Sequence, residues 1–194
     1  MGMNPAGLML GALLSMAALL SGCSAGPGPL VPADSGFAQI CMPARQGEWI
    51  NMGWAVENHG DTPVTIKSVR LPADASHLQM TTKTWLVPPY YVAKTKTHFL
   101  GGGVTGGPYP PPARTRNWDK RRPAVGAIIG PHQTDTLAAG LMRTSARTAR
   151  SGGPVIIYSA DGTTFTWQED ISVVLANDCT MPGVPHVPPA PSHD

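Results

Sequence analysis

The residues that could carry out catalysis are few and poorly grouped. A hydrolase nucleophile is often placed in a Gly-x-Ser-x-Gly turn, and the sequence has no such segment. The twelve acidic residues include the adjacent pair Glu169 and Asp170. Neighbours on a strand point to opposite faces, so this pair does not suit one substrate as glycosidase carboxylates do. We interpret it as a solvated strand end and expect no enzyme activity.

Histidine and methionine side chains suit Cu(I), and both types are spread through the chain. The local pair His77 and Met80 would point to opposite faces of an extended strand. Met52 alternates with Ile50 and Trp54, so we expect it in the core. No Asp-rich calcium loop is present. We therefore expect no metal and no cofactor, and a copper carrier is the less favoured alternative.

The residue types favour recognition instead. Tyr, Trp and Arg are enriched where proteins bind one another, and they gather in 85–91 and in the Gly/Pro-rich stretch 101–123. If these loops converge, they form an aromatic and basic surface for an envelope protein or, through the arginines of 114–122, for an anionic envelope polymer. In the alternative interpretation, Trp85 and one Tyr pack inside and the arginines are solvated. The candidate binding residues are Trp85, Tyr90, Tyr91, Tyr109, Trp118, Arg121 and Arg122.

An apolar run from Leu8 to Leu20 is followed by Ser21, Gly22 and Cys23. The run has the length of a signal-peptide core and is shorter than the roughly 20 residues that span a bilayer. The segment Leu20-Ser21-Gly22-Cys23 resembles the lipobox of bacterial lipoproteins. That resemblance implies a lipid on Cys23, cleavage before it, and attachment to the cell membrane outside the cytoplasm. An ordinary secretory peptide is the alternative.

The remaining cysteines, Cys41 and Cys179, lie near the two ends of the expected domain. In an exported protein such a pair is expected to form a disulfide, the alternative being two separate buried thiols. The net charge of +2 is too small to indicate nucleic acid as a partner.

Alternating apolar residues predict a strand over 50–57, followed by a turn at 58–63 that contains Gly60 and Pro63. We expect 64–71 to return as its antiparallel partner, with a bulge around Ser68 where the apolar positions change phase.

A hairpin is predicted at 155–168, because Asp161-Gly162 is a preferred two-residue type I′ turn. Further strands are predicted at 37–42, 78–87, 91–100, 125–129, 134–143 and 171–176. No helical apolar repeat follows the signal peptide, so we predict an all-β, antiparallel two-sheet sandwich.

The strand with Trp54, the turn Asn58-His59-Gly60-Asp61-Thr62-Pro63-Val64 and the late Tyr158-Ser159-Ala160-Asp161-Gly162 resemble the immunoglobulin-like domains of exported bacterial proteins. The resemblance implies that fold over 36–180, with a disulfide joining the first and last strands. Around it we expect a signal peptide at 1–22, a flexible tether at 23–35, a long loop at 101–123 and a disordered, Pro-rich tail at 181–194.

Overall fold

The computed structural model describes residues 28–32, 39–92, 97–99 and 106–180. The predicted signal peptide, the anchor residue Cys23, most of the tether and the tail lie outside the described residues. The elements are β1 (Leu30–Pro32), β2 (Gln39–Pro43), β3 (Trp49–Asn58), β4 (Val64–Arg70), β5 (Leu78–Met80), β6 (Trp85–Val87), β7 (Tyr90–Val92), β8 (Thr97–Phe99), the short 3-10 helix η1 (Trp118–Lys120), β9 (Arg122–Pro123), β10 (Ile128–Ile129), β11 (Thr134–Arg143), β12 (Ala149–Ser151), β13 (Val155–Ala160), β14 (Thr163–Gln168) and β15 (Ser172–Ala176).

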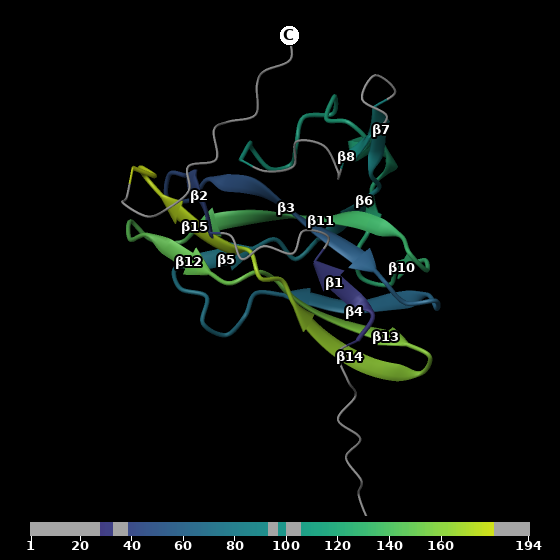
Figure 1. Cartoon of the computed structure of the whole chain (residues 1–194). Helices are drawn as coiled ribbons and strands as arrows, with labels where there is room; N and C mark the ends of the chain where they lie inside the picture. The colour runs from purple at the N-terminus through teal and green to yellow at the C-terminus, as the bar shows by residue number, and fades with distance from the viewer. Residues whose placement is uncertain (1–27, 33–38, 93–96, 100–105, 181–194) are drawn as a thin grey trace, which may run out of the picture.

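The strands form two facing layers (Figure 1). One layer is the sheet β1-β3-β11-β6-β9, with β5 also paired to β11. The other combines the sheets β10-β4-β13-β14 and β12-β15-β2, whose inward side chains belong to the same hydrophobic core as those of β3 and β11. The hairpin β7-β8 stands apart from both layers. The predicted fold class is confirmed: the chain is an all-β, immunoglobulin-like two-sheet sandwich.

The antiparallel pair β3 and β11 is the centre of the first layer. Its register runs from Thr134 opposite Glu57 to Met142 opposite Trp49. Side chains on the inward face of the pair are buried against the second layer, among them Met52, Trp54 and Leu137. The predicted core position of Met52 is therefore confirmed.

The predicted pairing of 64–71 with the preceding strand is wrong. β4 pairs with β13 and β10 in the opposite sheet, so the chain crosses between the layers after β3. The buried side chain of Asn58 holds this crossing, because its amide nitrogen lies 2.8 Å from the Thr62 carbonyl and its Oδ1 accepts from the Gly60 N–H at 3.0 Å. The turn was predicted correctly, but it connects two sheets.

The hairpin β13-β14 forms as predicted. Val155 to Ala160 pairs with Thr163 to Gln168, and Asp161 and Gly162 have φ angles of 47° and 74°. Positive φ at both central positions is the requirement of a type I′ turn. The bulge predicted around Ser68 is also present, since the β4-β13 register shifts between Ile157 and Tyr158, which pair with Ser68 and Ile66.

Two predictions about polar or flexible segments need correction. Leu30–Pro32, within the predicted tether, forms β1, which pairs with the end of β3; the Leu30 N–H also donates to the buried Tyr158 hydroxyl at 3.3 Å. Glu169 is only 2% exposed. The pair Glu169-Asp170 is therefore not a solvated strand end as a whole, although Asp170 is exposed.

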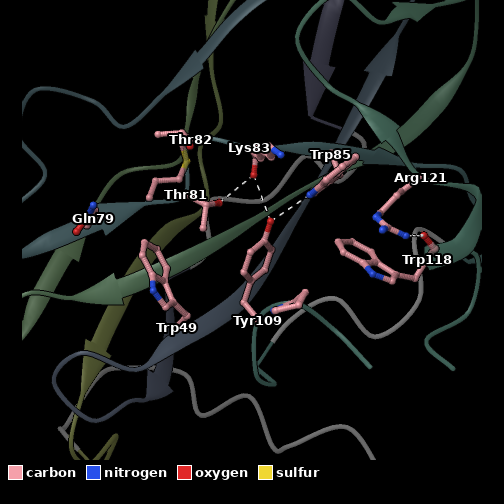
Figure 2. Close-up of a pocket in the computed structure, with 11 residues that line it drawn as sticks. Trp49, Gln79, Thr81, Thr82, Lys83, Trp85, Tyr109, Trp118 and Arg121 are labelled. Atoms are coloured by element: carbon pink, nitrogen blue, oxygen red, sulfur yellow. Dashed lines mark hydrogen bonds between the residues drawn. The ribbon is translucent and has the colours of Figure 1, made fainter. Parts of the chain in front are cut away.

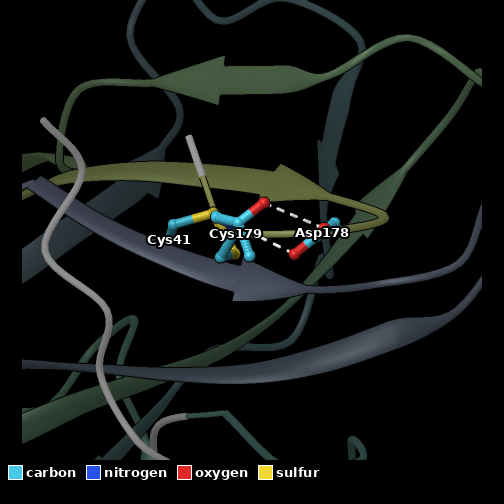
Figure 3. The surroundings of a disulfide bond; sticks show 4 residues. Cys41, Asp178 and Cys179 are labelled. Carbon is cyan, nitrogen blue, oxygen red and sulfur yellow. Dashed lines mark hydrogen bonds between the residues drawn. A yellow bond between two sulfur atoms is a disulfide. The ribbon is translucent and has the colours of Figure 1, made fainter. Parts of the chain in front are cut away.

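The predicted disulfide joins Cys41 in β2 to Cys179 just after β15 (Figure 3). Their Cα atoms are 5.7 Å apart, and β2 and β15 pair in parallel. The disulfide thus links β2, the first strand of the second layer in the sequence, to the end of β15, its last strand.

Replacing both cysteines, Cys41→Ala with Cys179→Ala, is expected to lower the free energy of unfolding by about 4 to 5 kcal/mol, because the link closes a long loop and restricts the unfolded chain. The sequence separation of 138 residues makes that restriction large. Urea unfolding of the variant and the parent chain measures the difference, with Cys23→Ser as the control. A loss below about 1 kcal/mol would contradict this role.

Candidate functional site

The outward face of β11 carries two small residues, Ala138 and Gly140. Ala138 pairs with Gly53 of β3 and Trp85 of β6, and Gly140 lies two residues further along the same face. Because these positions carry little or no side chain, bulky rings can lie directly on the sheet. A Cβ added at Gly140 would lie 2.7 Å from the Tyr109 ring.

The loop that supplies Tyr109 is attached to the edge of β3. The Asn51 N–H donates to the Gly107 carbonyl at 2.7 Å, and the Gly106 and Tyr109 N–H groups donate to Asn51 and Trp49 carbonyls at 2.9 and 3.0 Å. Residues 106–109 thus extend the sheet beside the first part of β3. This pairing places the Tyr109 ring on the sheet's outward face.

The Tyr109 hydroxyl connects two neighbouring segments (Figure 2). It accepts from the Trp85 indole nitrogen at 3.1 Å and donates to the Lys83 carbonyl at 3.2 Å. Both polar groups at the ends of these rings are therefore satisfied within the protein. Both rings are half-exposed, so part of their apolar surface is available to a ligand.

Arg121 lies between two indoles. Its guanidinium carbon is 4.9 Å from the Trp85 ring centroid and 4.8 Å from that of Trp118, distances at which a cation is attracted to an aromatic face. The guanidinium also donates to the Trp118 carbonyl at 2.7 Å. The buried Trp118 ring packs beside Val87 and Ala138 and meets Trp85 edge-on, at 6.4 Å between centroids. The helix η1 thus fixes Trp118 and Arg121 together.

These groups surround an open depression of about 400 Å³, which we call the aromatic hollow. In Figure 2, Tyr109 lies between Trp49 and the Trp85–Trp118 pair. The residues that line the hollow are Trp49, Gln79, Met80, Thr81, Thr82, Lys83, Trp85, Tyr109, Pro110, Trp118 and Arg121.

The hollow is apolar at its walls and positive in charge. Among the described residues, its lining includes Lys83 and Arg121 and no carboxylate. Gln79, Thr82 and Lys83 are exposed and offer hydrogen-bonding groups around the aromatic surface. Rigid rings with a polar rim are suited to binding a ligand by stacking and apolar contact.

The structure brings four predicted binding residues together: Trp85, Tyr109, Trp118 and Arg121. Trp49, whose ring also lines the hollow, was not among the predicted binding residues. The alternation at 50–57 was the available signal. Because Ile50 points inward, the preceding residue Trp49 is expected to point outward.

The other predicted binding residues lie elsewhere or outside the described side chains. Tyr90 has the Arg116 guanidinium 5.1 Å from its ring centroid and does not line the hollow. Asn117 donates to the Pro88 and Pro89 carbonyls at 3.2 and 3.0 Å, which ties this part of the loop to the start of β7. The Tyr91 side chain is not among the described ones.

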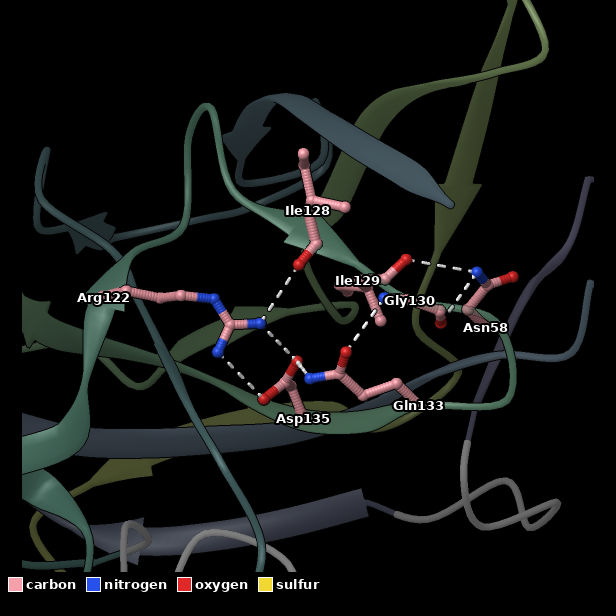
Figure 4. A network of polar contacts seen from close by, with 7 residues as sticks. All are labelled: Asn58, Arg122, Ile128, Ile129, Gly130, Gln133 and Asp135. Atoms are coloured by element: carbon pink, nitrogen blue, oxygen red, sulfur yellow. Dashed lines mark hydrogen bonds and ion pairs between the residues drawn. The ribbon is translucent and has the colours of Figure 1, made fainter. Parts of the chain in front are cut away.

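Arg122 was predicted as a binding residue, and it instead pairs with a buried carboxylate (Figure 4). Its guanidinium lies 2.7 Å from Asp135 Oδ2 and donates to the Ile128 carbonyl at 3.2 Å. Gln133 donates to the same carboxylate at 3.0 Å. Burial raises the pKa of Asp135 above its ordinary value, and Arg122 opposes that rise without cancelling it.

Within the described ranges, no group of three or more His, Cys, Asp or Glu side chains is placed to hold a metal ion. The same residues include no helix with the length and apolar character required to cross a membrane.

Comparison with known proteins gives distant likenesses in structure alone. No family model matches the chain, and no curated protein is similar to it in sequence. The chain is similar to the ASH/PapD-like domain 7 of human CEP192, with 12% identity, a TM-score of 0.39, and coverage of 85% of this chain and 96% of that one. It is also similar to the VesB protease of Vibrio cholerae, with 9% identity, a TM-score of 0.38, and coverage of 76% and 32%. A third likeness is to a family 123 glycoside hydrolase from Clostridium perfringens, with 10% identity, a TM-score of 0.32, and coverage of 72% and 23%. None of these carries an argument about activity.

Replacing Gly140 with Ala is expected to displace the Tyr109 ring and lower the free energy of unfolding by about 1 to 3 kcal/mol, as overpacking does. The new methyl group would also lie 2.8 Å from Thr81 Cγ2. Gly107→Ala is the matched control, because a Cβ there meets nothing within 4 Å. Equal stability losses in the two variants, measured by urea unfolding, would contradict the close packing.

The raised pKa of Asp135 predicts a pH dependence of stability. The folded protein binds this proton more tightly than the unfolded chain, so the contribution of Asp135 is greatest below the ordinary value of 3.8 and is lost as pH rises through the raised pKa. The unfolding free energy of the parent chain minus that of Asp135→Asn should therefore fall as pH rises from below 3.8 through the raised pKa of Asp135. Urea unfolding at successive pH values tests it. The exposed Asp74→Asn variant is the control, and a difference that rises with pH would reverse the assignment.

Proposed function

We propose that this chain is a non-catalytic binding module of the cell envelope, held at the membrane by a lipid on Cys23, and that the aromatic hollow binds an envelope protein. The observation that carries the proposal is the rigid, outward-facing set of Trp49, Trp85 and Tyr109 beside Arg121. Aromatic and Arg side chains contribute most to interface energies when they are held in place before binding.

The architecture supports this function. An immunoglobulin-like sandwich holds its loops on a rigid scaffold, an arrangement that commonly serves binding. Here the loop 106–123 is fixed to the sheet by backbone hydrogen bonds at its first residues and by the β6-β9 pairing at its end. Little conformational entropy is then lost when a partner contacts the hollow.

An anionic envelope polymer is the second candidate ligand. Within the part of the chain that the structure describes, two cationic side chains and no carboxylate line the hollow, which favours a negative ligand. Since exposed charges are screened by salt, polymer binding would weaken steeply with ionic strength. Protein binding based on the rings would depend on salt much less.

Photo-crosslinking in living cells tests the proposal. Probes at the exposed positions Gln79 and Thr82 on the rim are expected to yield one dominant protein adduct, and a probe at exposed Thr163 on the opposite layer is not. Trp49→Ala should weaken the binding of that partner by tenfold or more, as expected for a hot-spot Trp.

The matched control is Trp167→Ala, since this Trp is also half-buried but lies on β14 in the other layer. Equal binding by the Trp49→Ala variant and the parent chain would refute the hollow as the interface. Adducts that are polymeric only would replace the protein partner with the second candidate.

A further inference from the structure

The aromatic hollow continues into a second depression. A space of about 260 Å³ is lined by Thr82, Lys83, Thr84, Trp85, Pro123 and Val125, and it shares Thr82, Lys83 and Trp85 with the hollow. Val125 is 53% exposed, so the second depression has an apolar wall open to solvent. Together the two depressions form a groove with Trp85 between them.

The groove is rigid because strands fix both of its parts. Trp85 pairs with Pro123 across β6 and β9, and the Ala124 N–H donates to the Thr84 carbonyl at 2.9 Å. The hydrogen bond from Trp85 to Tyr109 fixes the indole from the other side. The spacing of the two depressions is therefore set before any ligand arrives.

A polyproline II helix matches this kind of surface. It has three residues per turn and a rise of about 3.1 Å per residue, so every third side chain lies on one ridge, about 9 Å from the next. Aromatic-lined grooves bind such helices, because the preformed conformation loses little entropy. A ligand with proline at every third position would present a row of proline rings along the groove.

The chain itself contains such a segment. Prolines recur at every third position in Pro182, Pro185, Pro188 and Pro191, while Pro189 lies off this ridge. The segment follows directly on the last described residue of the domain.

The last described residues are linked to the end of β11, a strand that also borders the hollow. Asn177 accepts a hydrogen bond from Arg143, the neighbour of Met142, and Met142 pairs with both Trp49 and Gln79 at the rim of the hollow. Adjacent strands are about 4.8 Å apart. The segment from Thr180 to Pro191 would span about 34 Å as a polyproline II helix, which is enough to pass around the sheet edge and along the groove.

We propose that the groove binds a polyproline II segment and that its occupant is residues 182–191 of the same molecule. The inference rests on the proposed function in using the same surface. An envelope partner would then have to displace this segment, so the apparent affinity of the hollow would be lowered by its own chain.

Fluorine NMR of the full-length chain in detergent, with 5-fluorotryptophan incorporated, tests the inference. Replacing Pro185 and Pro188 by Ala should shift the resonances of Trp49 and Trp85. The resonances of Trp54 and Trp167 should stay unchanged, because Trp54 is buried in the core and Trp167 lies on the other layer. Pro189→Ala is the matched control, since it removes a neighbouring proline from outside the ridge.

A synthetic peptide of residues 181–194, added to the Pro185→Ala, Pro188→Ala variant, should restore the parent shifts. Unchanged Trp49 and Trp85 resonances in that variant would overturn the inference. If the Trp49 and Trp85 chemical shifts of the parent chain depend on protein concentration, intramolecular binding is overturned. The segment would then bind the groove of a second copy. If the resonances stay unchanged while crosslinking from Gln79 still depends on Trp49, this inference fails and the proposed function stands.

Discussion

The pairing of β3 with β11 is the constraint on which the other features depend. Its inward face supplies Met52, Trp54 and Leu137 to the core, and its outward face supplies the small positions Ala138 and Gly140. Because side chains alternate along a strand, a single register decides both faces at once. A slip of one residue would bring large side chains under the Tyr109 ring and remove them from the core.

The sequence predicted those elements whose signals are local. The strand 50–57 agrees with its alternation and the hairpin β13-β14 with the Asp161-Gly162 turn, because period and turn chemistry act between near neighbours. The partner of β4 was not predictable in this way. Both sides of β3 are occupied, by β11 on one side and by β1 and residues 106–109 on the other. No edge of β3 is left for β4, which pairs with β13 and β10 instead. The partner of β4 is therefore decided by segments that are distant in sequence.

The sequence predicted which residue types form the candidate site. It was less successful in predicting which individual residues line it. Tyr109, Trp118 and Arg121 come from a stretch without periodicity, and such long loops are often functional. Trp49 belongs to a regular strand, where an aromatic residue is equally consistent with the core. Arg121 and Arg122 are neighbours with different roles, since one lies between indoles and the other neutralises buried Asp135. Only tertiary structure separates them.

The attachment of residues 106–109 to β3 also has a consequence for solubility. An uncovered strand edge presents unpaired N–H and C=O groups that recruit strands from other molecules and start aggregation. Gly106, Gly107 and Tyr109 occupy these groups of Trp49 and Asn51. Proteolytic cleavage within this loop would thus expose the aggregation-prone edge of β3. The same cleavage would release the Tyr109 ring from the aromatic hollow. By covering this edge, residues 106–109 protect the protein against self-association through β3.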